Sequence, residues 1–168
     1  MKTNPVHSGK SLHIPIMVQE VIQYLNIQKE GIYIDCTIGY GGHARYILER
    51  LSSKGKLIGI DKDEEALKYC KKILSHHKNI KLFHNSYKNI QDILSPSEIF
   101  KINGMLLDLG LSSPQMNSKV RGFSYKINAD LDMRYDLSQE FKAIDLLNFK
   151  SKKEIADIIY FYGEERRS

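Results

Sequence analysis

Hydrophobic positions along the chain change repeatedly between two spacings, and this change predicts strands and helices in turn. Short apolar runs rich in β-branched residues predict strands at 31–37, 56–60, 80–85 and 102–110. Segments with apolar residues three and four positions apart predict helices at 14–25, 43–51, 62–74, 87–94, 139–149 and 151–163. The third of these helices should turn Leu67, Cys70, Ile73 and Leu74 inward, and the last opens with Ser151 and Glu154 in capping-box spacing.

Strand and helix alternate from residue 32 to 109, which is the pattern of a doubly wound α/β fold with a parallel sheet. The fourth run, 102–110, is apolar almost throughout, so we expect a central strand. The alternation stops after it, and the chain to about residue 137 is polar, loop-like and dense in charged and aromatic residues.

Composition narrows the class of protein. The chain has 168 residues, of which 42% are hydrophobic and 27% charged, enough for one domain with a core. A net charge of +5 fits an anionic partner such as nucleic acid, or simply a Lys-rich surface. Two cysteines form no disulfide framework, and we find neither a secretion signal nor a membrane-spanning run, so we expect a cytoplasmic protein.

The glycine turn after the first strand predicts a nucleoside site. Gly39, Gly41 and Ala44 satisfy the loose dinucleotide fingerprint, but no Lys-Ser or Lys-Thr pair follows, which argues against a triphosphate. Asp61 closes the next strand, twenty positions beyond Gly41, where a carboxylate can accept both ribose hydroxyls. Its alternative role is to cap the following helix.

The segment "LLDLGLSSPQ" follows the fourth strand and favours one cofactor chemistry over another. It places Asp108, Ser112, Ser113 and Gln115 at the same sheet edge. Carbonyls, hydroxyls and an amide suit the positioning of a substrate amine, whereas no His-containing acid–base pair for hydride transfer is present. The pattern favours methyl transfer from S-adenosylmethionine, with an NAD-dependent oxidoreductase as a remote alternative.

Seven motifs in order carry a family resemblance. They are "HIPIMVQEVIQYL", "GIYIDCTIGYGGHARYIL", "IGIDKDEEAL", "GMLLDLGLSSPQ", "RGFSY", "LDMRYD" and "YGEER". Together they closely resemble the bacterial small-subunit (16S) ribosomal RNA cytidine N4-methyltransferases. The resemblance implies a Rossmann-like S-adenosylmethionine-dependent methyltransferase sheet with a helical insertion. It also implies methylation of a cytidine N4 amine in the RNA of the assembled or assembling 30S subunit.

The resemblance also implies residue roles. Cofactor contacts fall on Gly41, Gly42, His43, Asp61, Tyr87, Asp108 and Gln115. Asp35 would lie near the methionine amine. His43 could instead donate to the backbone at a helix start, and Tyr87 could be a packing aromatic. For catalysis, we hypothesise that Asp108, Ser112 and Ser113 position the substrate amine by accepting hydrogen bonds from its N–H groups.

Cationic and aromatic residues mix in the polar segment, which suits phosphate contacts and base stacking. The candidate RNA-binding residues are Lys119, Arg121, Phe123, Tyr125 and Arg134. The alternative is a loop ordered by pairs such as Arg134 with Asp132 or Asp136. The histidines show no metal-like spacing, so no metal site is predicted.

We expect a polar arm at 1–13, a methyltransferase core at 14–116, and a substrate loop with the start of the helical insertion at 117–168. Members of the family are longer, so we expect the remaining methyltransferase strands to be absent and the sheet to be incomplete, with an open edge beside the fourth strand. A truncated, non-catalytic remnant that binds cofactor or RNA is therefore an alternative to an active enzyme. The sequence leaves the oligomeric state open.

Overall fold

The computed structural model describes residues 14–168, and the arm predicted at 1–13 lies outside them. The chain forms two compact units, which divide between Ser113 and Pro114. Each is described by itself, as unit 1 and unit 2.

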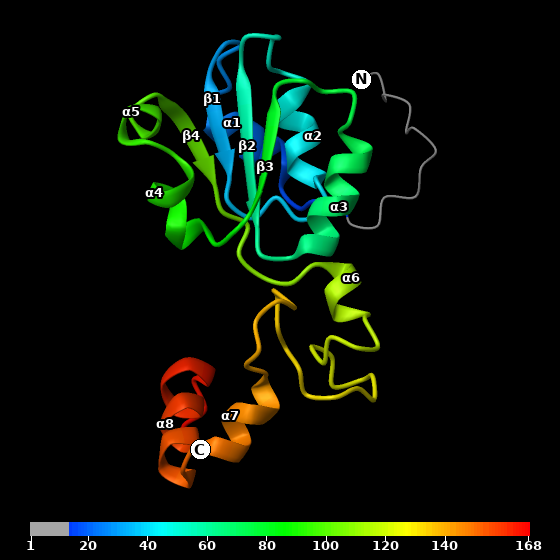
Figure 1. The fold of residues 1–168 in the computed structure, drawn as a ribbon, viewed down its shortest axis with the longest axis vertical. Coiled ribbons are helices and arrows are strands. Elements are labelled where there is room, and N and C mark those ends of the chain that lie inside the picture. Colours follow the sequence, from blue (N-terminus) through cyan, green and yellow to red (C-terminus); the bar gives the residue numbers. More distant parts are fainter. Residues whose placement is uncertain (1–13) are drawn as a thin grey trace. The chain divides into compact units, whose positions relative to one another are not determined.

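Unit 1 contains a four-stranded sheet and the helices around it (Figure 1). Its strands are β1 (Ile32–Asp35), β2 (Lys56–Asp61), β3 (Ile80–His84) and β4 (Ile102–Leu106). Its helices are α1 (Val18–Leu25), α2 (Gly42–Leu48), α3 (Glu64–Ile73), the 3-10 helix η1 (Tyr87–Asn89), α4 (Ile90–Ile93) and α5 (Pro96–Ile99). The predicted helices and strands of this unit are present, although β4 ends four residues before the predicted end at 110, and α5 was not predicted.

The described strands run parallel in the order β3-β2-β1-β4. This confirms the doubly wound α/β fold. The prediction of a central fourth strand is wrong for the described chain, because β4 lies at an edge and pairs only with β1. Its residues alternate between half-buried and exposed, and Met105 is 45% exposed. An apolar run shows that a strand can be buried on both sides, but not how many neighbours it has.

Alternate residues of the central strands enter two different cores, as the two-residue period of a strand requires. Tyr33 and Leu57 belong to the core formed with α2 and α3, to which α1 contributes partly buried side chains. Ile34 and Ile58 belong to the opposite core, with Leu94 and side chains from η1 to α5. Figure 1 shows α2 and α3 on one side of the sheet and α4 and α5 on the other.

Helix α3 follows its predicted pattern with one exception. Leu67, Cys70 and Leu74 are buried, but Ile73, which we expected to face inward, is 37% exposed. The three buried residues form a stripe along one side of the helix, and Ile73 lies at its margin.

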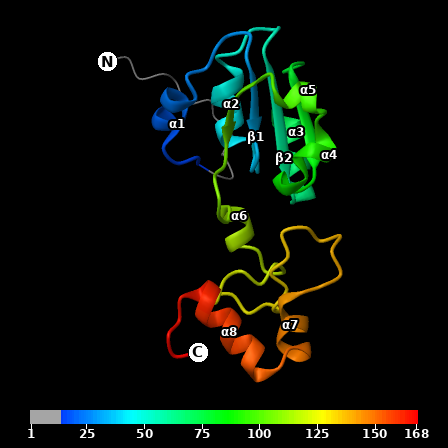
Figure 2. The ribbon, with the colours of Figure 1, turned by 90° about the vertical axis from the view of Figure 1, so that its left-hand side faces the viewer.

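Unit 2 contains loops and short helices. Helix α6 (Ser113–Met116) begins at the boundary between the units and was not predicted, whereas α7 (Ala143–Phe149) and α8 (Lys152–Gly163) lie where the sequence places them (Figure 2). The predicted capping box is present, since Ser151 Oγ accepts the Glu154 N–H and Glu154 Oε2 accepts the Ser151 N–H.

The interior of unit 2 is polar. Among residues 114–168, the buried side chains are Gln115, Arg121 and Asp132, while all the fully buried apolar side chains of the described chain belong to unit 1. The backbone at Gly122 is tight, because a Cβ there would lie 2.3 Å from the Asp130 carbonyl oxygen, and its φ of +68° favours glycine.

Candidate functional site

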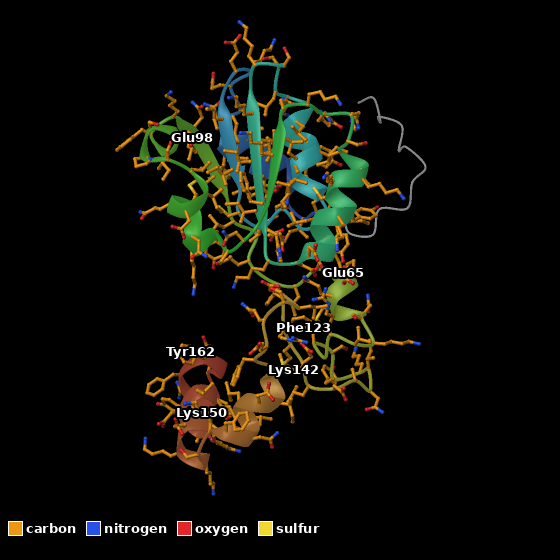
Figure 3. All side chains as sticks on the ribbon, in the orientation of Figure 1. Glu65, Glu98, Phe123, Lys142, Lys150 and Tyr162 are labelled. Carbon is orange, nitrogen blue, oxygen red and sulfur yellow. The ribbon has the colours of Figure 1, made fainter. Side chains whose placement is uncertain are left out.

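Three aspartates follow the strands of unit 1 at one edge of the sheet. Asp35 ends β1, Asp61 ends β2, and Asp108 comes two residues after β4. Because neighbouring parallel strands end at the same edge, their carboxylates lie where open α/β sheets bind ligands. Figure 3 shows the side chains at this edge, with Glu65 labelled in the first turn of α3.

Asp61 holds the glycine turn in place. One carboxylate oxygen accepts the Gly39 N–H at 2.7 Å, and the other accepts the Asp63 N–H at 2.9 Å. The cap of α3 is Asp63, whose side chain accepts the Glu65 N–H at 3.0 Å. The alternative role for Asp61, capping this helix, therefore belongs to Asp63. Each oxygen of Asp61 keeps a further lone pair that can accept a hydroxyl.

The glycine turn is closely packed on both sides. Gly41 has φ of +77°, and a Cβ on it would lie 3.1 Å from Cys70 Sγ on α3. A Cβ on Gly42 would lie 3.1 Å from Pro15. The Gly41 N–H donates to the Ile38 carbonyl at 2.9 Å and closes the turn. The φ of Gly41 favours glycine, and a side chain on Gly42 would press against Pro15.

Asp35 is the most buried of the three carboxyls, with 1% of its surface exposed. One oxygen accepts the Thr37 N–H at 3.2 Å, and no donor among the described residues meets the other. Burial raises the pKa of Asp35 to about 7; the Thr37 N–H lowers it in part, while the charges of Asp61 and Asp108 raise it further. This carboxyl therefore holds a proton for much of the time near neutral pH.

Burial also raises the pKa of neighbouring groups. It raises the pKa of Asp61, although the Asp63 and Gly39 N–H groups act in the opposite direction. The pKa of Cys36 rises to about 11 and that of Cys70 to about 12, through burial first and then through the nearby carboxylates. Both thiols are free and buried, and neither forms the thiolate that a reactive cysteine needs.

The loops after β1 and β4 are joined by hydrogen bonds. The Asp108 N–H donates to Thr37 Oγ1 at 2.8 Å, and the Cys36 N–H donates to the Leu106 carbonyl at 2.9 Å. Thr37 thus contacts both Asp35 and Asp108, a role that we did not predict. The only signal in the sequence is a hydroxyl residue two positions after the aspartate that ends a strand.

His43 links Asp108 to the segment before α1. Its ring is buried, with Nε2 2.8 Å from the Ile16 carbonyl oxygen and Nδ1 3.7 Å from Asp108 Oδ2. Because a carbonyl oxygen only accepts, Nε2 carries a hydrogen. The bond to the backbone is thus the kind that we considered as the alternative role, and the predicted cofactor contact stays a prediction.

Tyr87 is half-buried and packs against the core formed by Ile34, Ile58 and Leu94. The Asn85 N–H donates to the Asp61 carbonyl at 2.9 Å, so the segment that leads to Tyr87 begins beside Asp61. The packing role that we considered is therefore present. The predicted place beside the adenine stays a prediction.

The predicted amine-positioning loop spans the division between the units. Asp108, Ser112 and Ser113 belong to unit 1, whereas Gln115 is buried in unit 2. Ser112 is half-buried, and Ser113 is exposed at the start of α6. Their roles toward cofactor and substrate stay predictions.

Two of the candidate RNA-binding residues stabilise the interior of unit 2. Arg121 is 3% exposed and donates to the carbonyls of Arg134 and Tyr135, at 3.2 and 3.1 Å. The Arg134 guanidinium donates to both carboxylate oxygens of Asp132, at 2.8 and 2.7 Å, and this hydrogen bonding lowers the pKa of Asp132. The Arg134–Asp132 pair that we considered as the alternative is therefore present.

The other three candidates are more accessible. Lys119 is exposed, and Tyr125 is 94% exposed, with Lys126 Nζ 5.8 Å from its ring centroid. Phe123, labelled in Figure 3, packs its ring 5.3 Å from that of Tyr135. Contact of these residues with RNA stays a prediction.

In the part of the chain that the structure describes, no three histidine, cysteine or acidic residues are grouped so that they could hold a metal ion. None of the helices in that part is both long and apolar enough to cross a membrane.

The family model and the curated relatives that match this chain point to the same family. Residues 10–168 match the model of the MraW methylase family. A protein of Clostridium botulinum (strain Loch Maree) named "Ribosomal RNA small subunit methyltransferase H" is 44% identical over 93% of this chain and 50% of its own length. Proteins with the same name from Thermosipho africanus and Ureaplasma parvum are 46% and 44% identical, over 93% and 90% of this chain and 53% and 49% of theirs. The chain thus spans about half the length of these curated relatives.

Proposed function

This chain belongs to the MraW methylase family, and on that premise we propose that it binds S-adenosylmethionine and serves the methylation of a cytidine N4 amine in small-subunit (16S) ribosomal RNA. The observation that carries the proposal is the acidic sheet edge beside the glycine turn, formed by Asp35, Asp61 and Asp108. Within the described residues, no lysine or arginine pairs with these carboxylates, and the His43 ring lies 3.7 Å from Asp108.

The acidic edge favours one of the two cofactors that the sequence left open. A nicotinamide dinucleotide would bring a pyrophosphate to this edge, where the Asp61 and Asp108 carboxylates repel it. S-adenosylmethionine instead carries a sulfonium and an ammonium group. In our proposal, Asp61 accepts the ribose hydroxyls, and Asp35 and Asp108 face the cationic methionine end. Gly41, Gly42 and His43 line the turn, and Tyr87 lies beside the adenine.

The proposed chemistry needs positioning more than activation. When bound, S-adenosylmethionine supplies a methyl group on a sulfonium that leaves as a neutral thioether. Cytosine N4 is a weak nucleophile, since its lone pair is delocalised into the ring. Asp108, Ser112 and Ser113 would accept hydrogen bonds from the amine and hold it in line, an effect worth about 7 to 11 kcal/mol in ideal cases. The proton that the methylated amine loses would pass to Asp108 and from there to solvent.

The RNA would meet unit 2 on its accessible side chains. Tyr125 offers an exposed ring for base stacking, Lys119 a charge for phosphate, and Phe123 a second aromatic face. In this proposal Arg121 and Arg134 act chiefly by ordering the loop that presents them. The proposed partner is the assembled or assembling 30S subunit in the cytoplasm.

Because the chain spans about half the length of its relatives, cofactor binding and methyl transfer are tested separately. We expect S-adenosylmethionine to bind the 168-residue chain in calorimetry and NAD not to bind. Replacing Asp61 with Asn should weaken binding by at least about tenfold, since a hydrogen bond to a charged group is worth roughly 1.5–3 kcal/mol. Asp92→Asn, an exposed carboxyl on α4, is the matched control. Binding of NAD in place of S-adenosylmethionine would contradict the proposal.

Transfer is followed as radiolabelled methyl incorporated into unmethylated small ribosomal subunits. We expect Asp108→Ala and Ser113→Ala to reduce it, and unchanged turnover in both variants would disprove their positioning role. Binding of the cofactor without any transfer by the wild-type chain would favour the non-catalytic alternative.

A further inference from the structure

One oxygen of Asp35 has no donor among the described residues, although the side chain is almost completely buried. A buried carboxylate normally meets hydrogen bonds or an opposite charge, because leaving it without them is costly. Asp35 has the Thr37 N–H on its first oxygen and nothing described on its second. The arrangement is therefore incomplete in the free chain.

The groups that surround Asp35 make its ionised form still less favourable. Asp61 faces it from the end of β2 and Asp108 from the loop after β4, so both neighbouring strands contribute negative charge. The remaining titratable neighbours are thiols, Cys36 beside it in sequence and Cys70 on α3, and burial keeps both protonated. Within the described residues, no lysine or arginine pairs with any of the three carboxyls. Of the three, only Asp108 lies close to the His43 ring.

An almost completely buried carboxylate beside two other carboxylates cannot be ionised at low cost, so one of the three groups takes up a proton. Asp35 is the most buried of the three and accepts a single N–H, whereas Asp61 accepts two and the Asp108 side chain is 34% exposed to water. The proton therefore belongs on Asp35. A cation bound at the same edge would stabilise the ionised carboxylate, so Asp35 would lose this proton.

We infer that the free chain holds a proton on the Asp35 carboxyl and that binding of the cationic methionine end of the cofactor releases it to solvent. The inference rests on the proposed function and adds a regulatory property to it, because cofactor affinity then depends on pH. Where Asp35 is protonated in the free chain, each pH unit of acidification weakens binding by up to tenfold. Above the pH at which Asp35 ionises, the affinity becomes constant.

Calorimetry in two buffers of different protonation enthalpy measures the released proton directly. With wild-type chain at pH 6 we expect nearly one proton released per S-adenosylmethionine bound. The control ligand is 5′-methylthioadenosine, which keeps the adenosine and the sulfur but has neither sulfonium nor ammonium. It should bind with the same heat in both buffers.

Asp35→Asn removes the titrating group and keeps its shape. We expect this variant to bind S-adenosylmethionine more weakly at pH 8, with no buffer-dependent heat and a flat pH profile, while its affinity for 5′-methylthioadenosine stays within about twofold of wild type. Asp92→Asn should behave as wild type with both ligands. Circular dichroism shows whether each variant is folded, and the wild-type experiment in two buffers depends on no variant.

Two outcomes overturn different statements. If S-adenosylmethionine binds the wild-type chain with equal heat in both buffers between pH 6 and 7, the proton exchange is wrong and the proposed cofactor stands. If neither nucleoside binds at any pH, the proposed cofactor is wrong, and the proton exchange is overturned with it.

Discussion

In the proposed function, Asp35 serves ligand binding at a cost in folding stability. Its carboxyl is buried among negative charges, so ionising it makes folding less favourable, whereas a salt-bridged surface aspartate would make it more favourable. The same residue is one whose environment the sequence did not reveal. Its position at the end of a strand was predictable from "IYID", but its burial depends on Thr37 and on charges from two other strands.

Replacing Asp35 with Asn should stabilise the chain at alkaline pH. The pKa of Asp35 is about 7 when folded and near 3.8 when unfolded, so its favourable contribution is complete below pH 3.8 and is lost as the pH rises through 7. At pH 8 we expect the variant to be more stable than wild type by about 1 to 4 kcal/mol, and at pH 4 nearly equal. Urea unfolding at both pH values measures this difference. A variant less stable than wild type at pH 8 would contradict the assignment.

At the scale of elements, the junction between β2 and α3 joins the site to the fold. Asp61 ends the strand and Asp63 caps the helix, and the Asp63 N–H donates back to Asp61. Two aspartates in "IDKDEE" therefore have separate tasks, one toward the glycine turn and one toward the helix. Counting positions predicted a ribose contact for Asp61, with the capping of the helix as its alternative role, whereas its bond to the glycine turn was not predicted.

Asp63→Ala removes the cap of α3 and should lower the free energy of unfolding by about 1 to 2 kcal/mol. Asp63→Ser keeps a side-chain acceptor and should lower the free energy of unfolding by at most a few tenths of a kcal/mol. Because the chain has no tryptophan, urea unfolding is followed by far-ultraviolet circular dichroism. Equal destabilisation by both substitutions would show that the side-chain cap is not the cause.

Periodicity predicted the elements well where they are long enough to show a pattern. Helices α5 and α6 were missed because each has four residues, too few to show a helical repeat. The edge position of β4 depends on which strands are present to pair with it, and no residue of β4 carries that information. The roles of Ile16 and Thr37 at the site come from a carbonyl and a hydroxyl that only the folded chain brings near His43 and Asp108.

At the scale of the whole chain, the two units differ in what stabilises them. Unit 1 has two apolar cores on either side of its sheet, whereas the buried side chains of residues 114–168 are polar. Arg121 and Asp132 specify the loop conformation through hydrogen bonds, but burying them contributes little of the apolar free energy that stabilises a domain. Unit 2 should therefore open more readily than unit 1.

Limited trypsin digestion should cleave first within residues 114–168 and leave a protected fragment that contains unit 1. Lys119, Lys126 and Lys142 offer cleavage positions in unit 2, and transient opening exposes them. Mass spectrometry identifies the fragment. Arg134→Met, which removes the pair with Asp132, should accelerate this cleavage several-fold, while Lys88→Met on the exposed face of η1 should not. If the first cleavage occurs inside the sheet of unit 1, the prediction that unit 2 opens more readily is wrong.

The two buried thiols also have a practical consequence. Cys36 and Cys70 are the only cysteines in the chain, both belong to unit 1, and the pKa of each is well above neutrality. A maleimide or disulfide reagent can modify them only while unit 1 is open. The rate of thiol labelling therefore reports the opening of unit 1 alone, and its slowing by an added nucleoside would measure ligand binding without a fluorophore, a radiolabel or an assay of turnover.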